Sequence, residues 1–202
     1  KTDYAVFLLS DPGSPSEINF INNRIEDFYT SGLFASGAGL TLNAKGNEII
    51  GNGINTVRQR GIFLNPIKTA TIDGNTISNI SQYNVTGNRS YAVSAVGIAN
   101  PSVIKNNLIL NSNAGFLLTN CSLSIEGNEM TGPQLFGFYL QGSAGTTNIS
   151  LKSNKISGSN VGVYSATFNG AILNLDLQEN SISNAADNTF INYGANINTT
   201  CN

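Results

Sequence analysis

The stretch Leu123-Ser-Ile125-Glu-Gly-Asn128-Glu-Met130 alternates apolar and polar residues, reaches a glycine and an asparagine, and then resumes with an apolar residue. Apolar side chains therefore lie three residues before and two residues after Asn128. Alternation with a period of two predicts a β-strand that enters a turn, and the period of a helix is absent. The same pattern occurs seven times, around the anchor asparagines Asn23, Asn47, Asn75, Asn107, Asn128, Asn154 and Asn180.

Copies of this pattern follow one another at intervals of roughly 20 to 30 residues, a spacing typical of proteins in which each repeat forms one coil. A single coil cannot bury its apolar face alone, so neighbouring coils must stack. For a chain of 202 residues we predict an all-β, single-domain β-solenoid of roughly seven to nine coils.

The anchor asparagine has two expected roles. At a sharp corner between strands the backbone tends towards the left-handed region, which asparagine tolerates better than most residues. Coils stacked about 4.8 Å apart also bring identical amides within hydrogen-bond reach, which predicts an asparagine ladder. A glycine, asparagine or serine precedes the anchor in six copies and suits the same corner, whereas Glu179 departs from this pattern.

On these repeats the sequence resembles the right-handed parallel β-helix proteins of the pectate-lyase-like group, over nearly the whole chain. The resemblance implies a right-handed parallel β-helix, the hand that parallel crossovers generally favour. The group includes polysaccharide lyases, glycoside hydrolases, phage tailspikes, adhesins and structural proteins. The resemblance therefore implies a fold without selecting one activity.

A second element follows each anchor, and we expect it to form the other strand of each coil in a second sheet. It consists of a glycine and apolar residues at Gly32-Leu-Phe34, Gly61-Ile-Phe63, Gly97-Ile-Ala99, Gly115-Phe-Leu117, Gly137-Phe-Tyr139 and Gly162-Val-Tyr164, and of Thr189-Phe-Ile191 in the last coil. Its aromatic residues predict one stack packed in the core, formed by Phe34, Phe63, Phe116, Phe138 and Phe190.

The chain divides into three predicted parts. Residues 1–16 hold an apolar run and a turn cluster, which indicate a first or capping strand; residues 17–192 form the parallel β-helix; residues 193–202 are a polar tail without a repeat. Insertions at 51–60 and 78–96 lie on the same side of adjacent coils. Functional residues collect on loops carried by rigid scaffolds, so these insertions are the first place to expect a site.

Composition excludes several classes of function. Charged residues make up 11 % of the chain and the net charge is -2, so no basic patch indicates a nucleic-acid partner. No apolar run reaches about 18 residues, so we expect no membrane insertion. Phosphate-binding loops and zinc-ligand spacings are absent, and we predict neither a cofactor nor a metal site.

Cysteine and asparagine residues leave two questions about covalent modification open. Cys121 and Cys201 either form a disulfide, which requires the tail to fold back, or remain a buried thiol and a tail thiol. Sites of the form Asn-x-Ser/Thr permit glycosylation, although chance supplies several in so asparagine-rich a chain. They begin at Asn79, Asn84, Asn88, Asn120, Asn148 and Asn198.

Charged residues near the anchors alternate in sign along the chain and predict surface ladders. Glu48 and Asp73, in adjacent coils beside the insertions, are the best candidates for the paired carboxyl groups of a glycosidase. A lyase would use a basic side chain such as Arg58, Arg60 or Arg89 to take a proton, with Asp73 as a metal ligand.

Two absences weigh against an enzyme, because the chain has no histidine, the commonest general base, and no tryptophan. Tyr83 and Tyr91 would either stack on a sugar or fasten the large insertion to the coil beneath it.

Two functions therefore remain open. The first is a non-enzymatic β-solenoid, extracellular or on the cell surface, that acts as a spacer, an adhesin or a self-assembling unit. Its partner would be another copy of itself, joined end to end or laterally, in filaments where the ends stack. The second is a fragment of a polysaccharide lyase or tailspike-type hydrolase, with its groove beside residues 51–60 and 78–96 and a surface polysaccharide as partner.

Overall fold

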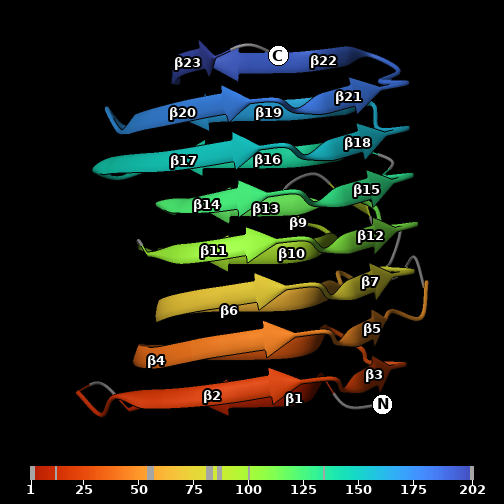
Figure 1. Cartoon of the computed structure of the whole chain (residues 1–202), viewed down its shortest axis with the longest axis vertical. Helices are drawn as coiled ribbons and strands as arrows, with labels where there is room; N and C mark the ends of the chain where they lie inside the picture. Colours follow the sequence, from red (N-terminus) through yellow and green to blue (C-terminus); the bar gives the residue numbers. More distant parts are fainter. Residues whose placement is uncertain are drawn as a thin grey trace.

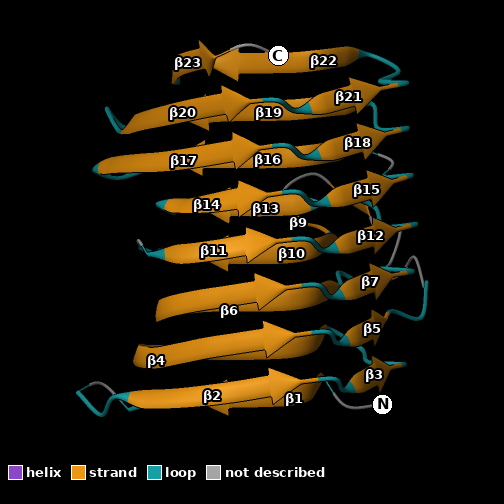
Figure 2. Ribbon diagram, in the orientation of Figure 1, coloured by secondary structure: helices purple, strands orange, loops and turns teal. Residues whose placement is uncertain are grey.

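The computed structural model describes residues 3–11, 13–53, 57–80, 84–85, 88–99, 101–133 and 135–200, with backbone alone for 84, 85, 88 and 200. These residues form a column of stacked coils built from parallel strands, with the N-terminus at one end and the C-terminus at the other (Figure 1). No helix occurs in them (Figure 2), and thus no helix that could cross a membrane. The prediction of an all-β parallel solenoid is confirmed.

Each coil has three sides, which we name the first, second and third faces. The first face contains β1 (Tyr4–Leu9), the first halves of β4 (Ser31–Lys45) and β6 (Arg60–Asp73), β10 (Tyr91–Val96), β13 (Phe116–Thr119), β16 (Phe136–Gly142), β19 (Val161–Thr167) and β22 (Asn188–Tyr193). The second face contains β2 (Ser16–Ile21), the second halves of β4 and β6, β11 (Ser102–Lys105), β14 (Leu123–Glu126), β17 (Thr146–Lys152), β20 (Ile172–Gln178) and β23 (Asn196–Thr200).

The third face is a seven-stranded sheet of three-residue strands. It contains β3 (Arg24–Glu26), β5 (Glu48–Ile50), β7 (Thr76–Ser78), β12 (Leu108–Leu110), β15 (Glu129–Thr131), β18 (Lys155–Ser157) and β21 (Ser181–Ser183). The expectation of two strands per coil was therefore incomplete. A strand of three residues holds one inward side chain, so its period of two is too short to recognise in the sequence.

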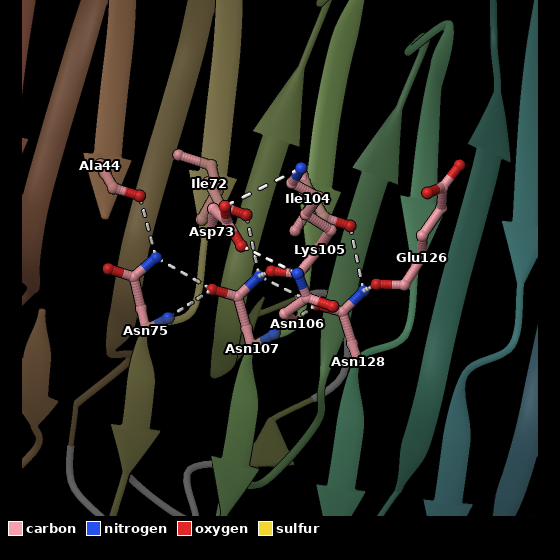
Figure 3. A network of polar contacts seen from close by, with 10 residues as sticks. All are labelled: Ala44, Ile72, Asp73, Asn75, Ile104, Lys105, Asn106, Asn107, Glu126 and Asn128. Carbon is pink, nitrogen blue, oxygen red and sulfur yellow. Dashed lines mark hydrogen bonds and ion pairs between the residues drawn. The ribbon is translucent and has the colours of Figure 1, made fainter. Parts of the chain in front are cut away.

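The anchor asparagines form a ladder at the corner between the second and third faces (Figure 3). The Asn75 side chain donates from Nδ2 to Oδ1 of Asn107 at 2.9 Å, and its backbone N–H donates to the same oxygen at 2.9 Å. Asn107 makes the same two bonds to Asn128, at 3.0 and 2.9 Å. Nδ2 of Asn75 also donates to the carbonyl oxygen of Ala44 in the preceding coil, so each amide joins three coils.

The residue that adopts the left-handed backbone conformation at the corner is the one before the anchor asparagine. The expectation that the anchor itself adopts this conformation was wrong. Positive φ angles occur at Asn22, Gly46, Gly74, Asn106, Gly127, Ser153 and Glu179. Glu179, which broke the sequence pattern, adopts φ of 54° as well. Asparagine is thus favoured at the anchor because its amide makes these hydrogen bonds. The residue before the anchor is favoured for its ability to adopt a positive φ angle.

Aromatic residues of the first face form two stacks on opposite sides of the sheet, and the predicted single core stack was wrong. Phe116 and Phe138 are register partners that stack inside the core, with ring centroids 5.0 Å apart. Phe34 and Phe63 belong to the row one residue later and meet in an outer row, with centroids 5.2 Å apart. An offset of one residue moves a side chain to the opposite face of a strand.

The second element of the fourth coil begins at Ala92, not at Gly97 as expected. Val93 is the register partner of Ile62, which places Ala92 where other coils have glycine. Gly115 shows why glycine prevails there: a Cβ would lie 2.4 Å from Sδ of Met130 and 2.5 Å from the carbonyl oxygen of Gly137. The large insertion therefore ends at residue 90, and it contains the hairpin of β8 (Asn84–Val85) and β9 (Asn88–Arg89).

Both terminal segments continue the solenoid. β1 pairs in parallel with β4, so residues 4–9 belong to the first coil. Residues 196–200, expected to be part of a frayed tail, form β23 and pair with β20, with Ile197 as the register partner of Leu175. The repeat was not recognised there because Thr199 takes the place of Leu177, where the seven recognised copies have an apolar residue, whereas backbone pairing does not depend on that side chain.

Replacement of Asn107 by alanine tests the ladder. Asn107 is buried, and the loss of its amide leaves the backbone N–H of Asn75 without its acceptor and the carbonyl oxygen of Ile72 without this donor. Because an unsatisfied buried group costs about 1–3 kcal/mol, we expect the variant to lose about 2–4 kcal/mol of unfolding free energy in a urea titration. Asn23→Ala at the exposed end of the ladder is the control, and an equal loss in both variants would contradict this role.

Replacement of Phe138 and of Phe63 by alanine tests the two aromatic stacks. Phe138 is buried in the core, so we expect a loss of about 3–5 kcal/mol for Phe138→Ala. Phe63 lies in the outer row and is only partly buried, so Phe63→Ala should cost less than half as much. Thermal unfolding of the two variants measures the difference, and equal destabilisation would place both rings in one core.

Candidate ligand-binding groove

A groove of about 470 Å³ crosses the outer surface of the first face. Arg58, Arg89 and Tyr91 line it from the two insertions and the start of β10, whereas its other lining residues come from β13, β16 and β19. These are Leu117, Phe136, Tyr139, Gln141 and Tyr164. The groove therefore joins loop residues to the regular outer surface of the solenoid.

The shape of the groove follows from one outward row of the first face. Pairing brings Phe63, Ser94, Leu117, Tyr139 and Tyr164 into register in successive coils. Serine and leucine are shorter than the aromatic residues on either side of them. The side chains of the row therefore project less from the sheet in the fourth and fifth coils, which gives the row a low part there. The insertions carry Arg58 and Arg89 over this low part and complete the wall of the groove.

Three aromatic rings form one wall of the groove. Tyr139 and Tyr164 stack with centroids 4.8 Å apart and planes 4° from parallel. The ring of Phe136 meets these rings at 66° and 63°. Aromatic pairs at such separations hold one another in place, so this wall is a rigid surface with two phenolic hydroxyl groups.

Two arginine side chains lie beside this aromatic wall. The guanidinium carbon of Arg89 lies 5.1 Å from the centre of the Phe136 ring, and Nε of Arg58 donates to the backbone oxygen of Arg89 at 2.9 Å. Burial lowers the pKa of Arg58. Because an arginine pKa is far above neutrality, Arg58 remains cationic despite this shift, and burial strengthens its interaction with any anion that enters.

Tyr91 is 4 % exposed at the base of the groove. Burial raises the pKa of its phenol, because the charged form would be desolvated. Arg89 opposes this pKa shift through its charge and through a hydrogen bond to the hydroxyl group. Tyr91 is therefore a neutral residue at physiological pH that positions Arg89.

Buried polar contacts fasten the two insertions to each other. Gln59 is buried; its backbone N–H donates to Oγ of Ser90 at 2.8 Å, and its Nε2 donates to the carbonyl oxygen of Phe28 at 2.7 Å. The backbone N–H of Tyr91 donates in turn to the carbonyl oxygen of Gln59 at 3.0 Å. These bonds fix both insertions to the coil beneath them. They thereby hold Arg58 and Arg89, which belong to the insertions, in position.

The structure divides the candidate site residues that the sequence suggested. Arg58, Arg89 and Tyr91 line the groove, and Arg60 is the register partner of Tyr91 in the neighbouring coil. Glu48 instead pairs with Arg24 on the third face. Tyr83 lies outside the described residues.

Asp73, at the end of the second face, accepts a hydrogen bond from Nδ2 of Asn106 at 3.0 Å and faces Nζ of Lys105 at 3.9 Å (Figure 3). Glu48 and Asp73 therefore contribute to charge ladders away from the groove. They are not brought together with Arg58, Arg60 or Arg89, and the structure shows no carboxyl pair formed by them.

Sequence reasoning missed the aromatic wall of the groove. Tyr139 and Tyr164 were assigned to second elements, but their common position two residues after the glycine was not recognised as an outward row. That common position is a signal in the sequence. Phe136 and Gln141 carry no such signal, because the outer face of a β-solenoid tolerates most residue types.

Five of the modification candidates, Cys121, Asn79, Asn120, Asn148 and Asn198, are not among the residues that line the groove. Cys121 is a free, buried thiol, and burial raises its pKa to about 11; Cys201 lies outside the described residues. Asn79, Asn148 and Asn198 are exposed, whereas the Asn120 amide bonds to Ser143. The side chains of Asn84 and Asn88 are not described. Glycosylation at any of these positions remains a prediction.

Comparison with known proteins places the chain in one family. A family model described as periplasmic copper-binding protein (NosD) matches residues 16–202. No curated protein and no solved structure is detectably similar to the chain.

Copper is not matched by the residues of this chain. Proteins bind copper through histidine, cysteine and methionine, but the chain has no histidine, two cysteines and one methionine. Cys121 and Met130 are both buried in the core. The described residues contain no group of three or more histidine, cysteine, aspartate or glutamate side chains placed to hold a metal ion. The residues of this chain therefore offer no donor set for the copper named in the family description. The family match nevertheless covers most of the chain, and this protein belongs to the NosD family of parallel β-helix repeat proteins.

Proposed function

We propose that this protein is an exported, non-enzymatic β-solenoid that binds an acidic glycan in the groove of its first face. One observation carries the proposal: Arg58 and Arg89 line the same groove as the stacked rings of Tyr139 and Tyr164, and the lining of this groove includes no carboxylate. A family described as periplasmic supports a location beyond the cytoplasmic membrane.

The charge distribution supports an anionic ligand. The chain has four arginines and a net charge of -2, yet Arg58, Arg60 and Arg89 lie around this groove. Arg58 and Arg60 are close enough for the charge of Arg58 to lower the pKa of Arg60. The guanidinium group matches a carboxylate with two hydrogen bonds, so arginines gathered around one groove favour an anionic ligand.

The aromatic wall supports a sugar as the carrier of that charge. Tyr139, Tyr164 and Phe136 give a flat apolar surface, and Gln141 adds an amide beside it. A pocket with apolar walls and a few placed polar groups is the usual form of a small-ligand site. A sugar ring has apolar C–H groups for the aromatic wall and hydroxyl groups for the amide and the phenols.

The same lining supports binding rather than catalysis. Hydrolysis by a glycosidase needs two carboxyl groups at the bond that breaks, and the acidic candidates Glu48 and Asp73 belong to the charge ladders of other faces. The sequence contains no histidine to act as the base of a lyase. Incubation of the protein with an acidic polysaccharide should accordingly release no product.

Self-assembly is the second candidate function. In the described residues β22 and β23 each pair with a neighbouring coil on one side only. The backbone groups of the other edge are suited to pair with strands of a second copy. Light scattering over a range of protein concentrations tests this candidate, and a constant monomer mass would contradict it.

Replacement of Arg89 by glutamine tests the groove. Because hydrogen bonds to charged groups contribute about 1.5–3 kcal/mol, we expect the variant to bind an acidic oligosaccharide roughly tenfold to a hundredfold more weakly. Isothermal titration with a uronic-acid oligosaccharide and with its neutral hexose counterpart measures the effect. The wild type should prefer the acidic ligand and lose affinity as salt increases.

Two control variants accompany this experiment. Arg24→Gln removes an arginine that is paired with Glu48 on the third face, and it should leave binding unchanged. Arg89→Lys keeps the charge and should bind with intermediate affinity. Equal affinity of the wild type for acidic and neutral ligands would overturn the acidic preference, and binding of neither would overturn the proposed function.

A further inference from the structure

We infer that the groove is one part of a longer binding track, in which Phe7, Phe34, Phe63 and Arg60 form a second subsite. The ligand would then be a polymer that lies parallel to the solenoid axis across several coils. This inference rests on the proposed function, because it assigns the length and direction of the same acidic glycan.

One outward row of the first face connects the N-terminal coils with the groove. Phe7, Phe34 and Phe63 are successive register partners in the first three coils, and Phe63 is followed in the same row by Ser94, Leu117, Tyr139 and Tyr164. From Phe7 to Tyr164 the row takes six steps of about 4.8 Å, or roughly 29 Å. Aromatic residues thus occupy the row on both sides of Ser94 and Leu117.

The rings at the N-terminal end form a connected surface. Phe7 and Phe34 stack with centroids 4.9 Å apart and planes 11° from parallel, and Phe34 meets Phe63 at 5.2 Å. Phe7 is 51 % exposed, so this stack reaches solvent. Phe34 is 8 % exposed, but Tyr4 is 39 % exposed and its ring lies 5.1 Å from that of Phe7. The exposed rings of Tyr4 and Phe7 thus form an apolar patch at this end of the row, which indicates a contact surface.

Arg60 links the aromatic stack to the groove. Its guanidinium carbon lies 4.0 Å from the centre of the Phe63 ring, and its register partner in the next coil is Tyr91, at the base of the groove. Burial and the charge of Arg58 lower the pKa of Arg60 to about 10. Nε of Arg60 is buried without a hydrogen-bond partner, so an anionic group beside it would relieve both the desolvation and the repulsion.

The positive charge of Arg60 favours an anionic ligand at this second subsite. An apolar protein segment would suit the three phenylalanines but would leave the buried cation of Arg60 without a counter-ion. A glycan with regularly spaced anionic groups suits both features, because the apolar faces of its sugar rings contact the phenylalanines while its anions approach Arg60, Arg58 and Arg89 in turn. The continuity of the row with the groove makes one polymer the simplest occupant of both.

A series of uronic-acid oligosaccharides from the disaccharide to the decasaccharide tests the track by isothermal titration. The wild type should bind the longest ligand roughly a hundredfold more tightly than the shortest, because occupation of the second subsite becomes intramolecular once the groove is filled. Phe7→Ala should remove most of this gain and leave the affinity for the disaccharide unchanged. Arg60→Gln should weaken the longest ligand more than the disaccharide, because Arg60 lies beside the groove and also serves the second subsite.

Two further variants separate the track from the groove. Tyr139→Ala should weaken the short and the long ligands alike, since it alters the groove itself. Phe168→Ala removes an aromatic residue that is 45 % exposed outside the row, and it should change neither affinity. Circular dichroism of each variant verifies that the solenoid is folded.

Several results would overturn the inference. If the wild type binds short and long acidic ligands equally, or if Phe7→Ala weakens both to the same degree, the second subsite does not exist although the groove does. If no acidic oligosaccharide of any length binds, the proposed function fails and the track fails with it. Retention of the full length dependence in Arg60→Gln would exclude Arg60 from the subsite.

Discussion

In-register stacking of one coil on the next is the constraint on which the whole structure depends. The five interior anchor asparagines use their amides to bond the coil before and the coil after, as Asn107 does between Asn75 and Asn128 (Figure 3). These bonds lie at a buried corner, where an unpaired amide would be costly. The ladder therefore fixes the register at one corner, and the parallel strands carry that register around each coil.

Because the coils stack in register, equivalent residues of successive coils form continuous surfaces along the axis. Inward side chains of all coils form one apolar core, while outward side chains of equivalent positions form rows along the axis. The third face and the adjoining corner carry rows of charge, such as Arg24 with Glu48 and Asp73 with Lys105. The first face carries aromatic rows instead, and the insertions bring arginines to them. The first and third faces of one column thus have different chemistry, and the first carries the aromatic rings and arginines of the proposed ligand site.

Membership of the NosD family fits this organisation at the level of the fold, since residues 16–202 match a family of parallel β-helix repeats. The copper named in the family description does not extend to the residues of this chain, because its soft donors are few and its described cysteine and methionine are in the core. A shared solenoid can carry unrelated sites, because the outer rows vary while the core and the corner asparagines keep the coils in register.

The sequence by itself determined the parallel solenoid, because a period of two and a recurring asparagine are local signals that repeat in every coil. It also marked the insertions and three residues of the groove, Arg58, Arg89 and Tyr91. Only the tertiary structure decided that Glu48 and Asp73 lie apart from them, that Phe34 and Phe116 occupy opposite sides of a sheet, and that Tyr139 and Tyr164 face the arginines. The physical reason is that a shift of one residue reverses the direction of a side chain, and insertion lengths alone do not specify where a loop folds.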